Sequence, residues 1–284
     1  MIGFCSRNLK LFFKDKSSVF FSLLAVFIII GLYALFLGDV LVKSLPGISG
    51  ARYLMDSWIM AGLLSVTSVT TTMGAFGIIV EDRAKKITKD FTSSPISKKS
   101  VLGGYILSAV LIGLFMSILA LVLAEIYIVS SGGKLMDPMT LLKVLGLIVL
   151  STVANSSLMF FLVSFFNSLN AFMTACTVIG TLIGFLTGIY LPIGNLPAGI
   201  QWVVKCFPVS HSAALFRQTM MAAPMEQSFA GAPAQAVAEF EQQMGVTFSF
   251  GETVLPAFGS ILILIATGAV FYLLSIWNLS RKKR

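Results

Sequence analysis

Residues 17–38 read SSVFFSLLAVFIIIGLYALFLG, without a single Asp, Glu, Lys or Arg. The same charged residues are missing from the stretches 57–80, 100–124, 144–204 and 253–280. A helix needs roughly 20 apolar residues to cross about 30 Å of hydrocarbon, and the stretch 144–204 is about three times that length. Because only helices and closed barrels satisfy their backbone hydrogen bonds in lipid, and the two-residue alternation of barrel strands is missing, these stretches predict membrane helices.

The chain is predicted to be an all-α membrane protein with one transmembrane domain over residues 1–284. It is 57% hydrophobic and 11% charged, against about 25% charged residues in a typical soluble domain. This composition leaves no room for a large soluble catalytic domain. Six transmembrane helices are expected, with a turn at the small polar residues 167–170 between the fourth and the fifth. Their predicted bounds are 17–38, 57–80, 101–124, 144–164, 171–191 and 253–279.

The distribution of positive charge predicts the orientation. Of the 20 Lys and Arg residues, 14 lie in segments 1–16, 81–100 and 281–284, which all fall on one side of the six helices. Since Lys and Arg are enriched in cytoplasmic segments, both termini are expected in the cytoplasm of a multi-pass protein of the bacterial plasma membrane. The net charge of +8 is therefore attributed to topology and to anionic lipids, not to nucleic acid.

Segment 1–16 is predicted to be an amphipathic helix at the cytoplasmic interface. Its apolar and basic residues recur on opposite sides of a helix with 3.6 residues per turn. They are Cys5, Leu9, Phe12 and Phe13 on one side, and Arg7, Lys10 and Lys14 on the other. Such a helix is either a passive anchor or a docking element for a cytoplasmic partner, and the residues alone favour neither.

Segment 81–100 reads EDRAKKITKDFTSSPISKKS and is the largest predicted cytoplasmic loop. It begins as a charged helix and breaks around 93–95, because the residue before Pro95 avoids helical angles. With about 20 residues it is far too short for a domain of its own. A dense surface of mixed charge is often only solvated; the alternative is a lever that another protein grips.

The external segment 192–252 is predicted in two parts. Its first half is apolar and interrupted by Pro and Gly, and Pro197 and Pro208 suit the first turn of a helix. Two short helices are expected at about 197–206 and 209–222. Each is too short to span the bilayer, which suggests re-entrant elements between the spans. The second half, 223–250, is acidic and is expected to form a small solvent-exposed helix with loops.

The sequence lacks the residues that catalysis or metal binding needs. His211 is its one histidine, which excludes a histidine-cluster metal site and favours a structural hydrogen bond over catalysis. No G-x-x-x-x-G-K-[ST] phosphate loop occurs, so an ATP site of that kind is excluded. Cys5, Cys176 and Cys206 lack metal-site spacing and are interpreted as small apolar fillers. No catalytic residue, metal or cofactor is therefore predicted in this chain.

Ionisable residues are almost absent from the predicted spans. Glu125, at the outer end of the third span, is the one candidate for the proton site of an ion-coupled secondary transporter, and it equally suits a boundary position. The weakly polar and aromatic residues of the spans either bond to neighbouring helical groups or line the path of an amphiphilic substrate. The candidates for such a path are Thr67, Thr70, Thr71, Asn155 and Phe160.

The chain thus has no energy source of its own. It is expected to be a channel, a passive scaffold such as an immunity protein that binds toxins without turnover, or the membrane part of a machine that a partner drives. The third reading fits the exposed lever of segment 81–100.

The order of these features resembles the ABC type-2 permease family, the membrane subunits of bacterial ATP-binding-cassette exporters. A basic amphipathic helix precedes the first span, and segment 81–100 has an acidic start and a Ser-Pro-Ile break followed by basic residues. A tight turn joins spans four and five. The external stretch YLPIGNLP (190–197) is followed by FP (207–208) and LFR (215–217). The third span opens with GGY (103–105), where the family often has Gly-Lys. The resemblance covers essentially the whole chain.

The resemblance implies an ATP-driven exporter in which this chain is not an enzyme. Two permeases, identical or different, would pair and bind two cytoplasmic ATP-binding-cassette ATPase subunits, which carry the ATP and Mg. The residues implied to contact the ATPase are Glu81, Asp82, Arg83, Lys85, Lys86 and Lys89 of the coupling loop, with Arg7 and Lys10 of the N-terminal helix.

The charge-free spans argue against a small ion or phosphate as substrate. The first expectation is a hydrophobic or amphiphilic molecule, such as a drug, an antimicrobial peptide or a lipid, as in multidrug efflux. The second is a polysaccharide or a lipid-linked glycan, although the chain offers 24 Phe and only 3 Trp for sugar stacking. Segment 223–252 is longer than in the shortest family members, which suggests a substrate-specific cap.

Overall fold

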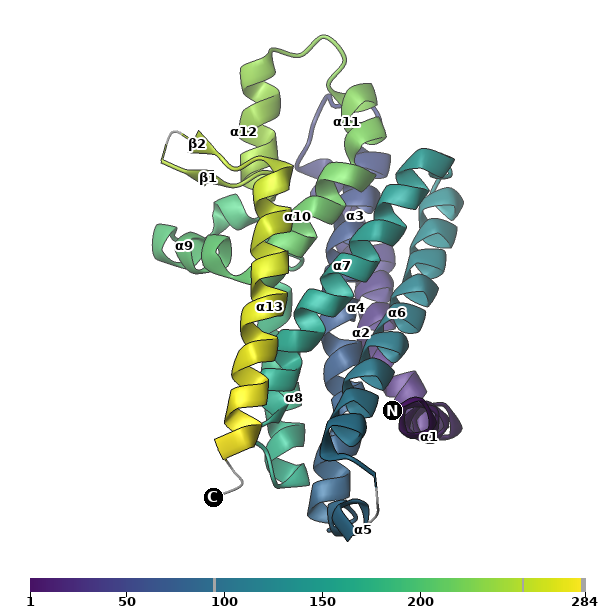
Figure 1. Ribbon diagram of the computed structural model, residues 1–284. Coiled ribbons are helices and arrows are strands. Elements are labelled where there is room, and N and C mark those ends of the chain that lie inside the picture. Colours follow the sequence, from purple (N-terminus) through teal and green to yellow (C-terminus); the bar gives the residue numbers. More distant parts are fainter. Residues whose placement is uncertain (94–95, 252, 282–284) are drawn as a thin grey trace.

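The computed structural model describes residues 1–93, 96–251 and 253–281, and helices dominate it (Figure 1). Within these residues, six helices are long and apolar enough to cross a membrane, as the sequence predicts. The first consists of α2 (Lys16–Leu32), the π-helical turn η1 (Tyr33–Leu37) and α3 (Gly38–Lys43). The others are α4 (Ala51–Ala84), α6 (Lys98–Ser130), α7 (Pro138–Val163), α8 (Leu169–Leu186) and α13 (Ala257–Arg281).

Several helices extend beyond their charge-free stretches. α4 begins at Ala51 and ends at Ala84, so it includes the charged residues on both sides of the predicted span 57–80. Glu, Lys and Arg are good helix formers, so a charge-free stretch measures the hydrocarbon crossing and not the helix. α8 instead ends earlier than predicted, at Leu186, because Gly188 (φ +68°) adopts the left-handed conformation that terminates helices.

α4 is the central helix of the bundle and packs against α2, α6, α7, α8 and α10 (Pro208–Met220). Small residues allow the helices to approach closely. A Cβ atom at Gly113 of α6 would lie 2.6 Å from the methyl group of Thr72 and 2.8 Å from that of Thr152. Helix association in lipid depends on such close contacts, because lipid supplies no hydrophobic driving force between helices.

The N-terminal helix α1 (Ile2–Lys14) lies across the long helices near one end of the bundle (Figure 1). Its buried residues are Phe4, Cys5, Asn8 and Phe12, and α6 is its main neighbour. The predicted apolar side is therefore rotated slightly, because Phe13 is exposed. Its position at a membrane interface stays a prediction.

The short helix α5 (Thr88–Ser93) lies at the same end of the bundle as α1 and the end of α13 (Figure 1). We call this end the terminal end. The segment predicted as a coupling loop, 81–100, therefore consists of the last turn of α4, α5 and the start of α6. The predicted break at Ser94 and Pro95 lies outside the described residues.

The opposite end, which we call the cap end, carries the elements of segment 192–252 (Figure 1). They are η2 (Ile193–Asn195), α9 (Ala198–Cys206), α10, α11 (Ala222–Ser228), α12 (Ala234–Met244) and the strand β1 (Ser249–Phe250). Its partner strand β2 (Thr253–Val254) occupies the start of the predicted sixth span 253–279, whose helix α13 begins only at Ala257. The two short helices predicted before the acidic part are present as α9 and α10, and their re-entrant depth in a bilayer stays a prediction. The described residues are predominantly helical, as the all-α prediction requires, and the antiparallel pair of the two-residue strands β1 and β2, with Phe250 opposite Thr253, is a small local addition.

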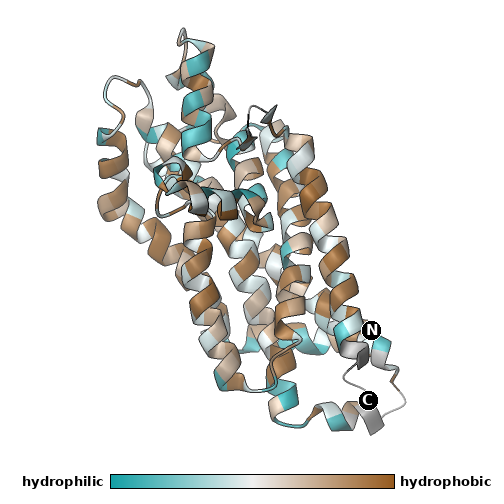
Figure 2. Cartoon of the chain, turned by 90° about the vertical axis from the view of Figure 1, so that its left-hand side faces the viewer, coloured by the Kyte–Doolittle hydropathy of each residue, from teal (hydrophilic) through white to brown (hydrophobic). Residues whose placement is uncertain are grey.

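The long helices are mainly apolar, and hydrophilic residues become more frequent toward the two ends of the bundle (Figure 2). This distribution is the one that a bilayer requires, since charged side chains are costly in its hydrocarbon core. The terminal end and the cap end are therefore the polar surfaces on which contacts with other molecules can form.

Candidate functional site

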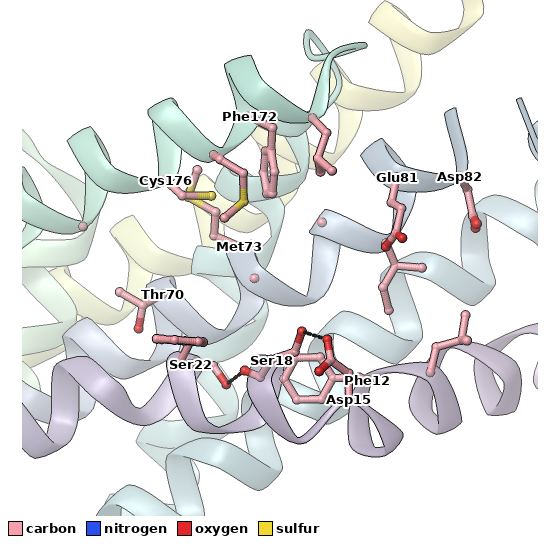
Figure 3. A pocket seen from close by; sticks show the side chains of 18 of the residues that line it. Phe12, Asp15, Ser18, Ser22, Thr70, Met73, Glu81, Asp82, Phe172 and Cys176 are labelled. Atoms are coloured by element: carbon pink, nitrogen blue, oxygen red, sulfur yellow. Dashed lines mark hydrogen bonds between the residues drawn. The ribbon is translucent and has the colours of Figure 1, made fainter. Parts of the chain in front are cut away.

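A groove with a cavity volume of about 650 Å³ lies between α1, α2, α4 and α8, toward the terminal end (Figure 3). Its size falls within the range of about 300–1,000 Å³ that is typical of small-molecule sites. Apolar side chains form most of its wall: Leu11, Phe12, Phe21, Val69, Met73, Ile78, Phe172, Met173 and Ile179. The groove therefore suits an apolar molecule or an apolar helix.

Glycines keep this groove open. Gly74 of α4 and Gly180 of α8 line it, and a Cβ atom built at either position would meet no atom within 4 Å. At Gly77, one turn beyond Gly74 on α4, a Cβ atom would lie 3.2 Å from the Phe172 ring. Glycine costs a helix about 1 kcal/mol of stability relative to alanine. The empty space beside Gly74 is therefore present at the expense of helix stability, which makes it a specific feature of this surface.

One end of the groove is charged. Arg7, Asp15, Glu81, Asp82 and Lys85 all line it, whereas the opposite part offers only weakly polar groups such as the Thr70 hydroxyl. The Asp15 carboxylate accepts a hydrogen bond from the Ser18 hydroxyl at 2.6 Å. This hydrogen bond has the largest effect in holding the pKa of Asp15 below its ordinary value, and a hydrogen bond from the Ser18 backbone has the next largest. The groove as a whole is amphiphilic.

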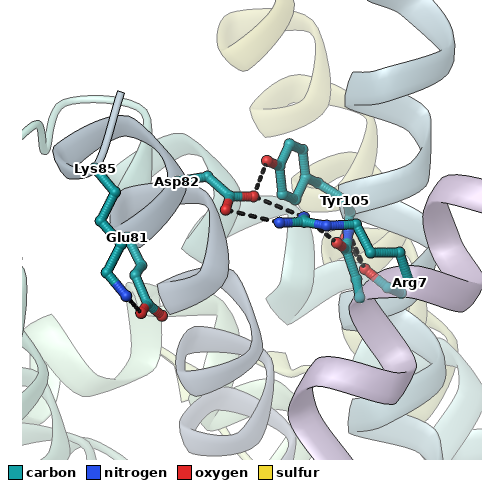
Figure 4. A network of polar contacts seen from close by, with 7 residues as sticks. Arg7, Glu81, Asp82, Lys85 and Tyr105 are labelled. Atoms are coloured by element: carbon teal, nitrogen blue, oxygen red, sulfur yellow. Dashed lines mark hydrogen bonds and ion pairs between the residues drawn. The ribbon is translucent and has the colours of Figure 1, made fainter. Parts of the chain in front are cut away.

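Arg7 and Asp82 form the central ion pair of the terminal end (Figure 4). Arg7 donates from Nη1 to Asp82 Oδ2 at 2.8 Å and from Nη2 to Asp82 Oδ1 at 2.9 Å, the bidentate geometry of strong guanidinium–carboxylate pairs. The Tyr105 hydroxyl of α6 donates to the same carboxylate. Asp82 is buried, and its hydrogen bonds with Arg7 raise the pKa of the guanidinium further. One carboxylate of α4 thereby ties α1 to α6.

Arg7 also joins the short helix α5 to this network. Its guanidinium carbon lies 5.2 Å from the ring centroid of Phe91 in α5 and 5.4 Å from that of Phe4 in α1, within cation–π range. In the same helix, Asn8 donates from Nδ2 to the Ser108 hydroxyl of α6 at 3.2 Å. The elements α1, α4, α5 and α6 are thus held together at the terminal end.

Arg83, the next residue of α4, binds a different part of the bundle. Its Nη1 donates to the carbonyl oxygens of Phe166, at 3.1 Å, and Val163, at 3.4 Å. These carbonyls belong to the end of α7 and the following turn, where a helix has unpaired acceptors and a cation is favourable. Asn278 of α13 binds the Ser164 hydroxyl of the same turn at 2.6 Å. The end of α4 is therefore connected to the α7–α8 turn and to α13.

The remaining predicted contact residues lie on the surface. Glu81 and Lys85 form an exposed i,i+4 ion pair (Figure 4). Lys10, Lys86 and Lys89 are exposed as well, and Lys86 has a φ of +61°, which ends α4. The structure thus divides the predicted set into an exposed group and the inward-bonded Arg7, Asp82 and Arg83, and contact with an ATPase stays a prediction for both.

The predicted path residues fall in two environments. Thr70 lines the groove. Four others lie in the packed interior: Thr67, Thr71, Asn155 and Phe160. Both threonines bond to their own helix, and Asn155 donates to the Ser68 hydroxyl at 2.7 Å. Phe160 packs on Phe76 with ring centroids 5.3 Å apart. Their role in a path stays a prediction.

Sequence reasoning missed the contributions of α8 and of the glycines to the groove. Phe172, Met173 and Cys176 of α8 line it together with Gly74 and Gly77 of α4. The pair of glycines one turn apart was a usable signal, because small residues on one face of a membrane helix mark a close approach or an opening. The residues of α8 gave no comparable signal, since apolar side chains in a span are the rule.

The candidates for other chemistry have structural partners. His211 is buried, its Nε2 lies 2.9 Å from the Lys205 carbonyl and its Nδ1 lies 3.1 Å from the Ser260 hydroxyl, so it has the structural hydrogen bonds that were expected. Glu125 accepts a hydrogen bond from the Met136 backbone at 3.2 Å. In the described ranges, no group of three or more His, Cys, Asp and Glu residues is placed to hold a metal ion.

A family model described as "ABC-2 family transporter protein" matches residues 42–277 of the chain. The match includes α4 with Asp82 and Arg83, and also α5, α8 and the elements of segment 192–252, whereas α1 with Arg7 precedes it. A search of curated proteins finds no match.

Proposed function

Because the chain belongs to the ABC-2 family of transporter proteins, we propose that it is the transmembrane subunit of an ATP-driven exporter of hydrophobic or amphiphilic molecules. A separate pair of ATPase subunits binds ATP and Mg and hydrolyses the nucleotide. Two permeases, identical or different, form the membrane part of the complex. The terminal end faces the cytoplasm of a bacterial cell, in line with the 14 Lys and Arg residues that the sequence has in segments 1–16, 81–100 and 281–284.

The observation that carries this proposal is the amphiphilic groove against α4, which ends at the ion pair of Arg7 and Asp82. The groove offers apolar walls for an aliphatic or aromatic body and charged side chains for a polar head. Its aromatic lining consists of Phe12, Phe21 and Phe172, without Trp or Tyr among the described lining residues. This composition favours an amphiphile over a polysaccharide, which would use stacking platforms with a polar handle.

The same network provides the mechanical coupling. The exposed part of the terminal end, with Glu81, Lys85, Lys86 and Lys10, is the surface for the ATPase. A force on α5 or on the end of α4 reaches α1 and α6 through Asp82, and α7 and α8 through Arg83. A helix of 34 residues such as α4 is about 50 Å long at 1.5 Å per residue, so α4 carries the motion across the whole bilayer.

A second permease completes the path. The helices α2 and α8 flank the groove and expose large apolar side chains, for example Phe20, Val178 and Leu182. Lipid covers such residues in an isolated subunit. In the complex, the second permease packs against this side and converts the open groove into an enclosed route.

Two other functions receive less support from the contacts. An ion-coupled transporter that uses Glu125 needs a carboxylate that changes partners, whereas this side chain is bonded to the Met136 backbone. A passive scaffold or immunity protein needs neither an open groove nor a network that joins six helices to an exposed surface. The first alternative predicts transport that does not depend on ATP, and the second predicts no transport.

The experiment is ATP-dependent uptake of an amphiphilic dye into inverted vesicles that hold the chain with its ATPase. A Gly74→Leu variant places a side chain in the groove and should abolish uptake while the complex still assembles. Gly146→Leu is the matched control, because Gly146 is also an exposed helical glycine with no atom near its Cβ position. Equal uptake by the two variants, or uptake without ATP, would contradict the proposal.

A further inference from the structure

A buried guanidinium without a counter-ion lies at the cap end. Arg217 of α10 is 0% exposed, and none of the ion pairs among the described residues includes it. Its Nη1 makes one long hydrogen bond, 3.4 Å, to the Gly245 carbonyl. Its Nε and Nη2 have no hydrogen-bond partner within the described part of the chain. Burial lowers the pKa of Arg217 to about 9, so the group still carries its charge at neutral pH.

The surroundings are shaped to keep this guanidinium in place. Its carbon atom lies 4.6 Å from the ring centroid of Trp58, a cation–π contact that covers one face. Glycines leave room at its edges: a Cβ atom at Gly62 would lie 3.1 Å from Nη2, and one at Gly245 would lie 3.3 Å from Nη1. A charge that is removed from water without a partner is strongly unfavourable, so the unpaired Nε and Nη2 are free to donate to an anionic group.

Arg217 belongs to the wall of a cavity of about 510 Å³ between α10, α11 and α12. The wall is mostly apolar, with Met221, Met225, Phe229, Val237 and Val246. Methionine adapts its shape to different apolar ligands, and the volume suits a small molecule. The cavity thus offers apolar walls for a hydrocarbon body next to a buried cation.

Two carboxylates also line this cavity, and neither neutralises the arginine. Glu226 is exposed to solvent, which screens its charge. Glu241 is half-buried, and burial raises its pKa. Neither side chain is within ion-pair distance of Arg217 in the described structure. The strongest unsatisfied charge of the cavity is therefore positive.

We propose that Arg217 and this cavity form a binding site at the cap end for an amphiphile with an anionic head group, either a carboxylate or a phosphate. Arg217 is 0% exposed without a ligand, so its side chain turns toward the cavity on binding. The head group then accepts hydrogen bonds from Nε and Nη2, which suit the planar, bidentate recognition of such anions. The apolar part packs against the methionines and Phe229. Binding at this site does not require the proposed function. Its interpretation does rest on that function, because the anionic amphiphile would be the substrate class that the exporter releases at the cap end.

Trp58 provides the readout, since its indole contacts the guanidinium. In a Trp202→Phe, Trp277→Phe background, Trp58 is the one remaining tryptophan, and both replaced residues are exposed. The full-length chain in phosphatidylcholine nanodiscs is titrated with dodecanoate, dodecyl phosphate, dodecanol and acetate. A saturable change in Trp58 fluorescence is expected with the two anionic amphiphiles, at least tenfold weaker binding with dodecanol, and none with acetate.

Two variants separate the charge from the cavity. Arg217→Gln should weaken the binding of dodecanoate by about 10- to 100-fold, the usual effect of a lost hydrogen bond to a charged group. Ala222→Phe fills the cavity, whose wall includes Ala222, and should weaken both anionic amphiphiles while Arg217 is retained. Lys134→Gln, a change of an exposed cation outside this cavity, is the control and should leave the affinities unchanged.

Some outcomes would overturn the proposal. Dodecanol that binds as tightly as dodecanoate would remove the role of the charge, and so would an Arg217→Gln variant that folds and binds normally. Since Arg217→Gln could fail to fold, Arg217→Lys, which keeps the charge, and Ala222→Phe give independent results. Binding is measured without ATP or an ATPase. Normal binding beside failed ATP-driven uptake would therefore contradict only the proposed function, and the reverse result only this site.

Discussion

Replacement of Asp82 by Asn should release α1 from the end of α4. The carboxylate accepts two hydrogen bonds from Arg7 and one from Tyr105. Its side chain is 4% exposed, whereas that of Arg7 is 30% exposed, so Arg7 can turn to solvent when its partner is lost. The loss of hydrogen bonds to a charged group costs about 1.5–3 kcal/mol. A value of about 2 kcal/mol corresponds to a change of about 30-fold in the equilibrium between docked and released α1.

Hydrogen exchange of the α1 amides, followed by mass spectrometry on the protein in nanodiscs, measures this equilibrium. Exchange in residues 2–14 should become about 30-fold faster in Asp82→Asn, while the amides of α7 keep their rates. Glu81→Gln is the matched control, because Glu81 precedes Asp82 and its ion pair among the described residues is the exposed one with Lys85. Surface pairs contribute about 0–1 kcal/mol, so this control should change the α1 rates by less than about fivefold.

The coupling between the two residues gives the decisive result. Arg7→Gln alone should accelerate exchange to a similar degree, and the double variant Arg7→Gln, Asp82→Asn should add little, because both changes remove the same interaction. If α1 exchanged at the normal rate in Asp82→Asn, or if the two effects were simply additive, the ion pair would not be what docks α1. The mechanical link from the ATPase surface to α6 would then need another route.

Two further predictions concern the cap end. Gly245 has a φ of +65°, and a Cβ atom there would lie 2.4 Å from the Ile193 side chain. Gly245→Ala should therefore destabilise the protein by about 2 kcal/mol and lower its thermal unfolding temperature. Gly251 has a similar φ of +63° but free space around its Cβ position, so Gly251→Ala is the control and should lower this temperature less. Burial lowers the pKa of His211, so the folded state disfavours the protonated imidazole. The contribution of the neutral imidazole to stability is complete above pH about 6.5 and decreases at lower pH. His211→Gln should make this loss of stability at low pH smaller, as measured by unfolding curves at several pH values. A variant with the same pH profile as the unchanged protein would disprove the prediction.

The sequence predicted the spans well because lipid imposes a simple rule on it. A long stretch without charge and without the alternation of barrel strands is stable in hydrocarbon as a helix, and the five charge-free stretches, of which 144–204 holds two spans, account for the six helices. The short helices α9 and α10 were also predictable, since Pro197 lies at the N-cap of α9 and Pro208 at the first position of α10. These are local signals that depend on a few neighbouring residues.

The roles of Glu81, Asp82 and Arg83 could not be predicted in the same way. In the sequence they form one acidic-to-basic stretch, but consecutive residues of a helix point about 100° apart. Glu81 therefore faces solvent, Asp82 faces α1 and α6, and Arg83 faces the α7–α8 turn. Which of the three directions is buried depends on helices that are distant in the sequence.

The lengths of the charge-free stretches, together with the polar turn at 167–170, by themselves predicted six helices long and apolar enough to cross a membrane, because only helices and closed barrels satisfy the backbone in lipid and the alternation of barrel strands is missing here. Only the tertiary structure decided which faces of those helices meet, and with that the groove beside Gly74, the ion pair between Arg7 and Asp82, and the unpaired guanidinium of Arg217. The physical reason is that contacts between helices depend on their rotation and order in the bundle. Residues far apart in the chain determine the rotation and the order of the helices. The sequence of a uniformly apolar span contains almost no local signal for its rotation or its position in the bundle.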